Sequence, residues 1–286
     1  MYVIEEQAQQ QLNQEWNVCV IQMDVRIGDP EHNFAQVEHQ IREAMERSST
    51  RPDVIVLPEM WNTGYALERI HELADLDGQR TQALLSELSQ RYQVNIVGGS
   101  VAVRSNVQSQ ANVTNTVYIT NRNGEIVATY SKTHLFKLMN EHLHLTAGDS
   151  LGTFSLDGVP CAVIICYDLR FPELVRTLAL QGSQVLFVPA QWPHPRLHHW
   201  RTLLTARAIE NQMYVVACNR VGTSIGDDGA STAFFGHSVI LNPWGETVAE
   251  GQEEAEFVTG QLSLPLVEEV RARIPVFADR RESLYQ

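Results

Sequence analysis

The 286-residue sequence has no long hydrophobic run and comparatively few cationic residues, and both shortages exclude classes of protein. Its longest apolar stretches fall far short of the roughly 20 residues that a membrane-spanning helix requires, so no membrane span is expected. Against 34 acidic residues stand only 21 basic ones, and the formal net charge of −13 argues against binding to nucleic acid or anionic membranes. Small molecules are therefore the expected partners.

Paired cysteine spacing and a secretory signal are also lacking. The four cysteines, at positions 19, 161, 166 and 218, fall in or at the end of strand-like runs, without the spacing of a zinc site or a disulfide framework. The glutamine-rich start has neither a basic beginning nor an apolar centre, so export is not expected and a cytoplasmic location is favoured. We interpret residues 1–16 as a frayed N-terminal extension.

No Pro-, Gly- or Ser-rich linker and no internal repeat divides the chain, so residues 17–286 are expected to form one domain, with a C-terminal arm from about residue 264. Apolar periodicity predicts helices over residues 31–47, 79–92, 172–181 and 197–211. It predicts strands over residues 17–23, 54–57, 94–98, 113–119, 126–130, 161–166, 185–188, 214–218, 238–241 and 256–262. This alternation indicates an α/β fold with two sheets.

Cys166 is the first candidate for chemistry, because it ends an apolar strand-like run shortly before Pro172 and Glu173, which are typical of a first helical turn. A thiol at such a junction would lie near the positive end of a helix dipole, which favours the thiolate. A cysteine among apolar residues is more commonly an inert core residue, so its partners decide the matter. Two further strand-like runs end near Glu59 and Lys132.

The segments around these three residues resemble the carbon-nitrogen hydrolase (nitrilase) superfamily. The resemblance is carried by Leu57–Tyr65, Tyr130–Phe136 and Cys166–Glu173, and it extends from about Val18 to about Leu262. It implies a four-layer α-β-β-α sandwich, a Glu-Lys-Cys catalytic triad, and a helical face used for dimerisation. A homodimer or a higher homo-oligomer is accordingly expected.

Amide hydrolysis needs a nucleophile, a proton shuttle and a positive group facing the oxyanion. Cys166 would attack, Glu59 would move the proton, and Lys132 would meet the oxyanion. The resemblance implies that the backbone N–H of Tyr167 is the second oxyanion donor and that a thioester forms. Taken singly, Glu59 and Lys132 are more commonly solvent-exposed residues without a role in chemistry, so the interpretation rests on the three motifs together.

The resemblance also implies a second glutamate that positions the lysine. Glu141, nine positions after Lys132, is the candidate. Glu125 in this role, or a surface role for Glu141, are the alternatives.

Besides Tyr167, three residues are candidates for binding the substrate. Arg170 has the planar fork that pairs bidentately with a carboxylate, and Tyr65 can donate a hydrogen bond. Trp192 follows a buried strand and is expected to cover the site as an aromatic lid. The alternatives are an Arg170 clamped to Asp168 or Glu173, and a Trp192 that only packs.

Clustered histidines suggest a metal site, but the pattern around them does not complete one. They are His142, His144, His194, His198 and His199. No cysteine or carboxylate spacing accompanies them, and the resemblance implies a chemistry without a metal or another cofactor.

Among the superfamily's branches the sequence is most similar to the omega-amidases, on the evidence of Cys166–Pro172, Gln191–Pro193 and Ala206–Gln212. This similarity implies hydrolysis of a small dicarboxylic monoamide, such as 2-oxoglutaramate, 2-oxosuccinamate or succinamate, with release of ammonia. An N-carbamoyl amino acid amidohydrolase is the main alternative, disfavoured by the single arginine, Arg170, near the nucleophile. A true nitrilase and a catalytically silent scaffold are the others.

Overall fold

A computed structural model describes residues 15–48, 50–106, 112–225, 229 and 231–285. The predicted N-terminal extension, residues 1–16, therefore lies outside the described residues except for Glu15 and Trp16. These two residues open the first strand, and Trp16 is only 2% exposed, so the strand predicted from residue 17 begins two residues earlier.

Two mixed sheets form the centre of the molecule. The first has the order β15 (Glu256–Ser263), β1 (Glu15–Gln22), β2 (Val54–Val56), β4 (Asn95–Arg104), β5 (Val113–Thr120) and β6 (Ile126–Ser131), with β3 (Asp75–Leu76) paired to β4. The second has the order β14 (Thr247–Glu250), β13 (Val239–Leu241), β10 (Tyr214–Asn219), β9 (Val185–Ala190), β8 (Val159–Val163) and β7 (Thr153–Leu156). In each sheet three parallel strands are flanked by antiparallel ones: β1, β2 and β4 in the first, and β8, β9 and β10 in the second.

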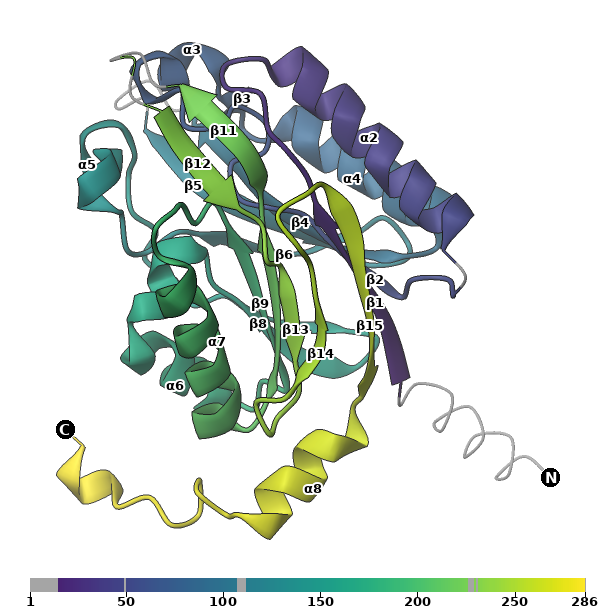
Figure 1. The fold of residues 1–286 in the computed structure, drawn as a ribbon, viewed down its shortest axis with the longest axis vertical. Helices are drawn as coiled ribbons and strands as arrows, with labels where there is room; N and C mark the ends of the chain where they lie inside the picture. Colours follow the sequence, from purple (N-terminus) through teal and green to yellow (C-terminus); the bar gives the residue numbers. More distant parts are fainter. Residues whose placement is uncertain (1–14, 49, 107–111, 226–228, 230, 286) are drawn as a thin grey trace.

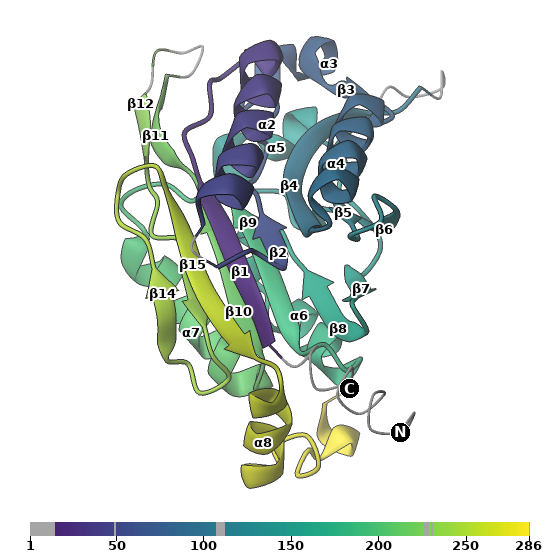
Figure 2. The same ribbon diagram turned by 90° about the vertical axis from the view of Figure 1, so that its right-hand side faces the viewer.

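Helices cover the outer face of each sheet, as Figures 1 and 2 show. Helices α2 (Pro30–Arg47) and α4 (Gln79–Tyr92) pack on the first sheet, and α6 (Pro172–Leu180) and α7 (Leu197–Asn211) lie over the second. Shorter elements, α3 (Ile70–Leu73), α5 (Glu141–His144) and the hairpin β11 (Val221–Ile225) to β12 (Ser231–Phe235), lie near one end of the sheets. The predicted four-layer α-β-β-α sandwich is confirmed.

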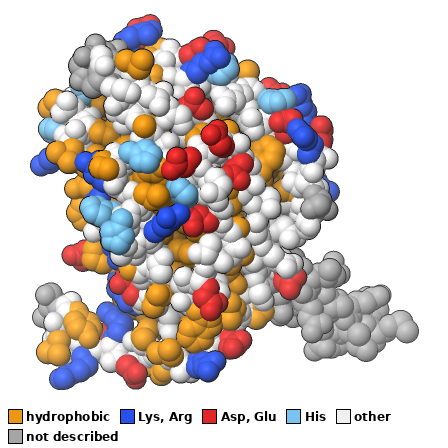
Figure 3. Space-filling view, viewed as in Figure 1, with side chains coloured by type: hydrophobic (Ala, Val, Ile, Leu, Met, Phe, Trp, Pro, Cys, Tyr) orange, Lys and Arg blue, Asp and Glu red, His pale blue; other side chains and the backbone are white. Residues whose placement is uncertain are grey.

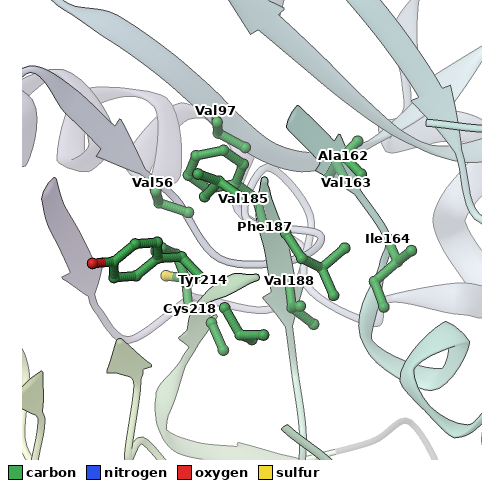
Figure 4. Packing of buried hydrophobic residues seen from close by; sticks show 14 of the residues in the cluster. Val56, Val97, Ala162, Val163, Ile164, Val185, Phe187, Val188, Tyr214 and Cys218 are labelled. Carbon is green, nitrogen blue, oxygen red and sulfur yellow. The ribbon is translucent and has the colours of Figure 1, made fainter. Parts of the chain in front are cut away.

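The main core lies between the two sheets. Val56 and Val97 of the first sheet belong to the same buried cluster as Val185 and Phe187 of the second, and Figure 4 shows these side chains close together. Full burial of one such side chain contributes roughly 1.5–3 kcal/mol. Because the central strands are covered on both faces, they appear in the sequence as nearly continuous apolar runs.

The predicted helices at 79–92 and 197–211 have the observed bounds, whereas the strand predicted at 94–98 continues to Arg104. The two glycines at positions 98 and 99 form an irregularity in the pairing between β4 and β5. Gly99 has φ +60°, and a Cβ there would lie 2.1 Å from the carbonyl oxygen of Pro58. The glycine therefore allows the strand to continue past the turn that carries Glu59.

The C-terminal segment begins with α8 (Pro265–Arg273), which packs on its own subunit. Val267 and Val270 are buried, and the Gln212 side-chain amide donates to the Ile274 carbonyl at 2.7 Å. Beyond Ile274 most residues are exposed to solvent.

The visible surface mixes charge with apolar groups: Figure 3 shows acidic, basic and hydrophobic side chains interspersed on one face. Within the described ranges, every helix is too short or too polar to cross a membrane.

Candidate active site

The candidate catalytic residues lie just beyond the ends of strands. Glu59 lies three residues after β2, Lys132 directly follows β6, Cys166 lies three residues after β8, and Gln191 directly follows β9. The carboxyl ends of parallel strands are where open α/β sheets commonly form their sites. Here the ends of the two sheets contribute to one site.

The turn that carries Glu59 is anchored to the neighbouring strand β4. Ser100 donates its N–H to the Pro58 carbonyl at 3.1 Å, and its own carbonyl accepts from Trp61 N–H at 3.0 Å. Its hydroxyl oxygen accepts from Met60 N–H at 3.0 Å. Met60 has φ +47°, an uncommon conformation for a residue with a side chain, and the Ser100 bonds hold it.

The carboxylate of Glu59 is fully buried, and its two oxygens differ in their partners. Oε1 is within bonding distance of three donors: Lys132 Nζ at 2.9 Å, Asn115 Nδ2 at 2.8 Å and the Tyr65 hydroxyl at 2.9 Å. Oε2 accepts from the Gln191 backbone N–H at 2.8 Å. Because Oε1 is crowded with donors, Oε2 is the oxygen better placed to take a further proton.

Glu141 lies on the other side of the Lys132 ammonium. Its Oε1 lies 2.7 Å from Nζ and 2.6 Å from the Tyr65 hydroxyl, and its Oε2 accepts from the Phe136 N–H at 2.8 Å. The structure thus brings Glu141 to the lysine, whereas the alternative Glu125 is exposed and bonded to Asn121.

Lys132 is a buried cation between two carboxylates. Burial lowers its pKa, but Glu59 and Glu141 oppose this and hold the pKa well above its ordinary value. Lys132 is therefore charged at neutral pH. An ammonium has three protons, and the two carboxylates account for two, so the third is available to an oxyanion.

Cys166 occupies a strained turn. The strand β8 ends at Val163 rather than at residue 166, and Cys166 begins a short 3₁₀ segment, Cys166–Arg170, with φ +47°. Such a conformation costs on the order of 1–3 kcal/mol and is typical of residues whose position has a function. The helix α6 begins only at Pro172.

The expectation that a helix dipole favours the thiolate of Cys166 is wrong. Burial raises the pKa of the thiol well above its ordinary value, and the neighbouring Glu59 raises it further, while Lys132 opposes this only in part. At neutral pH the group is a thiol. An attack by sulfur therefore requires a base, and Glu59 is the carboxylate that interacts most strongly with this thiol.

Asp168 connects the nucleophile turn to the lysine segment. Its buried carboxylate accepts from the Tyr130 hydroxyl at 2.7 Å, the Thr133 hydroxyl at 3.1 Å, the His134 N–H at 2.9 Å and the Ile165 N–H at 3.0 Å. These bonds join residues 130–134 to residues 165–168. Asp168 therefore sets the relative position of Cys166 and Lys132.

Gln191 bonds to Glu59, and Arg220 holds Gln191 in place. The Gln191 side-chain amide donates to the Glu59 carbonyl at 2.7 Å and accepts from Arg220 Nη1 at 3.2 Å. Arg220 is fully buried and also donates to Asp24 and to the Val25 carbonyl. Sequence reasoning missed the support from Asn115 and Arg220, which lie far apart in the chain and in no motif, and it used Gln191 only as part of the motif Gln191–Pro193.

A narrow pocket opens beside Cys166. Its cavity volume is about 20 Å³, which holds about one water molecule, so entry of an amide requires movement of side chains at the mouth. The lining residues are Tyr65, Phe136, Met139, Cys166, Tyr167, Arg170, Gln191, Trp192, Pro193 and Arg196. All four predicted substrate-binding residues, Tyr65, Tyr167, Arg170 and Trp192, are among them.

The contacts of the pocket residues show how each is placed for binding the substrate. Trp192 is 3% exposed and packs against Trp200 at 5.4 Å, so it forms a wall of the pocket rather than a mobile lid. The Tyr65 hydroxyl faces the two catalytic-site carboxylates. The guanidinium of Arg170 lies 4.7 Å from the Trp192 ring, and it forms no ion pair with Asp168 or Glu173. Arg196 is a second pocket arginine that sequence reasoning missed.

The histidines do not assemble a metal site. In the part of the chain that the structure describes, no group of three or more His, Cys, Asp or Glu side chains is arranged to hold a metal ion.

Buried thiols predict how the stability of the protein depends on pH. Burial raises the pKa of Cys19 to about 12, and it raises those of Cys161, Cys166 and Cys218 as well. The native state therefore keeps protons that the unfolded chain loses near pH 8.5, so this stabilisation is complete below pH 8.5 and is lost as the pH rises toward the native values. Cys19 alone is expected to lower the free energy of unfolding by about 2 kcal/mol at pH 10.

Urea unfolding between pH 7 and pH 10 under reducing conditions measures this effect. Cys19→Ala is the control, because it removes one of the groups and should make the decline shallower. A free energy of unfolding that stays constant or rises above pH 8.5 would contradict the prediction.

Comparisons with known proteins agree with the geometry. The family model described as carbon-nitrogen hydrolase matches residues 17–272. A relative from Bacillus subtilis named 2-oxoglutaramate amidase is 46% identical over 94% of this chain and 99% of its own length. An omega-amidase from Homo sapiens is 33% identical over 86% of this chain and 88% of its own. The crystal structure of a carbon-nitrogen hydrolase from Helicobacter pylori has the same fold, with a TM-score of 0.88 at 23% identity over 95% of this chain and 97% of that one.

Proposed function

Because this chain belongs to the carbon-nitrogen hydrolase family, we propose that it hydrolyses the terminal amide of a small carboxylate-bearing amide of the 2-oxoglutaramate or succinamate type. The observation that carries the proposal is the buried cluster of Glu59, Lys132 and Glu141 beside the Cys166 thiol. The thiol in turn lines a pocket together with Arg170. The relatives named 2-oxoglutaramate amidase and omega-amidase support the choice of substrate.

In the first half-reaction Glu59 takes the thiol proton while Cys166 Sγ bonds to the amide carbon. The oxyanion is stabilised by Lys132 Nζ and by the Tyr167 N–H. Glu59 then gives the proton to nitrogen, the C–N bond breaks, and ammonia leaves a thioester on sulfur.

The second half-reaction returns the enzyme to its starting state. Glu59 takes a proton from water, the water oxygen bonds to the thioester carbon, and the carbon–sulfur bond breaks. Glu59 gives that proton to the sulfur, and the product acid ionises and leaves as a carboxylate. Glu141 and Tyr65 hold the Lys132 ammonium and the Glu59 carboxylate in place throughout, as positioning residues.

Arg170 receives the carboxylate of the substrate in this scheme. Its guanidinium is half-buried over Trp192 and has no carboxylate partner among the described residues. Arg170→Gln is expected to lower kcat/KM for succinamate by about tenfold or more, since a hydrogen bond to a charged group contributes about 1.5–3 kcal/mol. For butyramide, a neutral amide of similar size, kcat/KM should fall little. An equal fall of kcat/KM for both substrates would contradict this role.

Ammonia release from a panel tests the activity itself. The panel contains 2-oxoglutaramate, succinamate, an N-carbamoyl amino acid and a simple nitrile, with Cys166→Ala as the blank. The second pocket arginine, Arg196, is an observation that favours the N-carbamoyl alternative, since such enzymes place additional cations near the nucleophile. Cys166-dependent release from the dicarboxylic monoamides is expected. Preference for the N-carbamoyl compound or the nitrile, or no release at all, would overturn the proposed substrate class.

We further propose a cytoplasmic homodimer or higher homo-oligomer. All four cysteines are free and buried, which suits a reducing compartment. Exposed apolar residues on α7 and beyond α8, Ile209 and Ile274, suit a contact between subunits. Analytical ultracentrifugation tests the assembly, and a monomer at micromolar concentration would contradict it.

A further inference from the structure

Two arginines line the same small pocket, and neither is neutralised by the protein. Arg170 and Arg196 are both half-buried at the pocket wall. Within the described ranges, neither forms an ion pair with a carboxylate. The guanidinium of Arg170 instead lies over Trp192 and lies 3.4 Å from His199 Nδ1.

The two positive charges are close enough to affect each other. Burial lowers the pKa of Arg170, and repulsion by Arg196 lowers it further. In a chain with a net charge of −13, placing two cations together without a carboxylate between them is unfavourable unless an anion binds there. The pair is thus suited to hold an anionic part of a ligand.

Both arginines lie beside the path to the thiol, since Cys166, Arg170 and Arg196 line the same pocket. Arg170 interacts electrostatically with both Cys166 and Arg196. Arg196 also lines an outer hollow of about 400 Å³, together with Leu138 and His194. An amide whose carbonyl carbon lies at Cys166 therefore extends its chain into the space that Arg170 and Arg196 both line.

We propose that Arg196 is a specificity-determining residue that, with Arg170, binds the 2-oxo acid end of the substrate. Arg170 takes the carboxylate, and Arg196 donates to the 2-oxo oxygen and the nearer carboxylate oxygen. One guanidinium fork already matches both oxygens of a carboxylate, so a second fork calls for a further acceptor, and a 2-oxo group beside the carboxylate supplies it. This inference rests on the proposed function, because it concerns the substrate of the same site.

Three amides of equal chain length separate the contributions. 2-Oxoglutaramate has the carboxylate and the 2-oxo group, glutaramate has only the carboxylate, and pentanamide has neither. Arg196→Gln is expected to lower kcat/KM for 2-oxoglutaramate by about tenfold or more, to change that for glutaramate about threefold or less, and to leave that for pentanamide unchanged. Arg196→Lys keeps the charge but lacks the fork, so most of the loss should persist.

A control variant and the pattern of losses make the test decisive. Arg201→Gln removes a positive charge from α7, where Arg201 is bonded to Glu250 outside the pocket. It should leave the ratio of kcat/KM for 2-oxoglutaramate to kcat/KM for glutaramate unchanged. Equal losses on 2-oxoglutaramate and glutaramate, a loss that includes pentanamide, or no loss at all would each overturn the role of Arg196. If the wild-type enzyme does not prefer either acid over pentanamide, the proposed function itself fails.

Discussion

Replacement of Cys166 by alanine is expected to lower kcat for amide hydrolysis by about 10⁴-fold or more while the protein stays folded. The reason is chemical, because the Cys166 thiol interacts with both Glu59 and Lys132, whereas the Tyr65 hydroxyl in the same site is already bonded to the Glu59 and Glu141 carboxylates. Folding should persist because the change removes one sulfur from a strained position at the pocket wall. Initial rates of ammonia release, together with circular dichroism, measure both effects.

Cys161→Ala provides a matched control for this result. Cys161 is also buried and unpaired, lies five residues earlier, and its thiol bonds only to the Val159 carbonyl. Its loss should cost stability but leave kcat close to that of the wild type. If Cys166→Ala retained full activity, or if Cys161→Ala were the inactive variant, the nucleophile assignment would fall.

Replacement of Lys132 by methionine is expected to affect activity and stability together. The variant loses a donor to the oxyanion, which lowers kcat by roughly 10²–10³-fold. It also leaves Glu59 and Glu141 facing each other in a site without solvent, and breaking a buried ion pair in this way costs about 3–5 kcal/mol. Steady-state kinetics and urea unfolding measure the two losses.

Lys137→Met is the control for the lysine variant. Lys137 is exposed five residues further along the same segment and lines neither the inner pocket nor the outer hollow. It should behave as the wild type in both measurements. A Lys132→Met protein of unchanged stability would show that the lysine does not neutralise the two carboxylates, and unchanged kcat would remove it from the mechanism.

Apolar periodicity predicted an α/β fold with two sheets, and the family resemblance implied the four-layer sandwich and a position for Glu141 beside Lys132. The helix predicted at 79–92 has the observed bounds, and Glu141 lies 2.7 Å from Lys132. The hairpin of β11 and β12 was missed, because its short strands mix polar with apolar residues and lack a continuous apolar run.

Contacts between distant segments account for the remaining errors. The pKa of Cys166 depends on burial and on Glu59, 107 residues earlier in the chain, so a local helix-dipole argument predicted the wrong direction. Asn115 reaches the site from β5 and Arg220 from between β10 and β11, neither within a motif, and Arg196 enters the pocket just before α7 begins. Only the packing of the two sheets brings these side chains together.

Trapping the acyl-enzyme tests the central claim most directly. Wild-type protein is mixed with excess 2-oxoglutaramate, quenched in acid within the first turnovers, and mapped by peptide mass spectrometry, with Cys166→Ala treated in parallel. The mechanism predicts an acyl adduct on the peptide that contains Cys166, absent from the variant and removed by hydroxylamine. Ammonia release by the wild type with the adduct on another residue, or with equal release by Cys166→Ala, would contradict it.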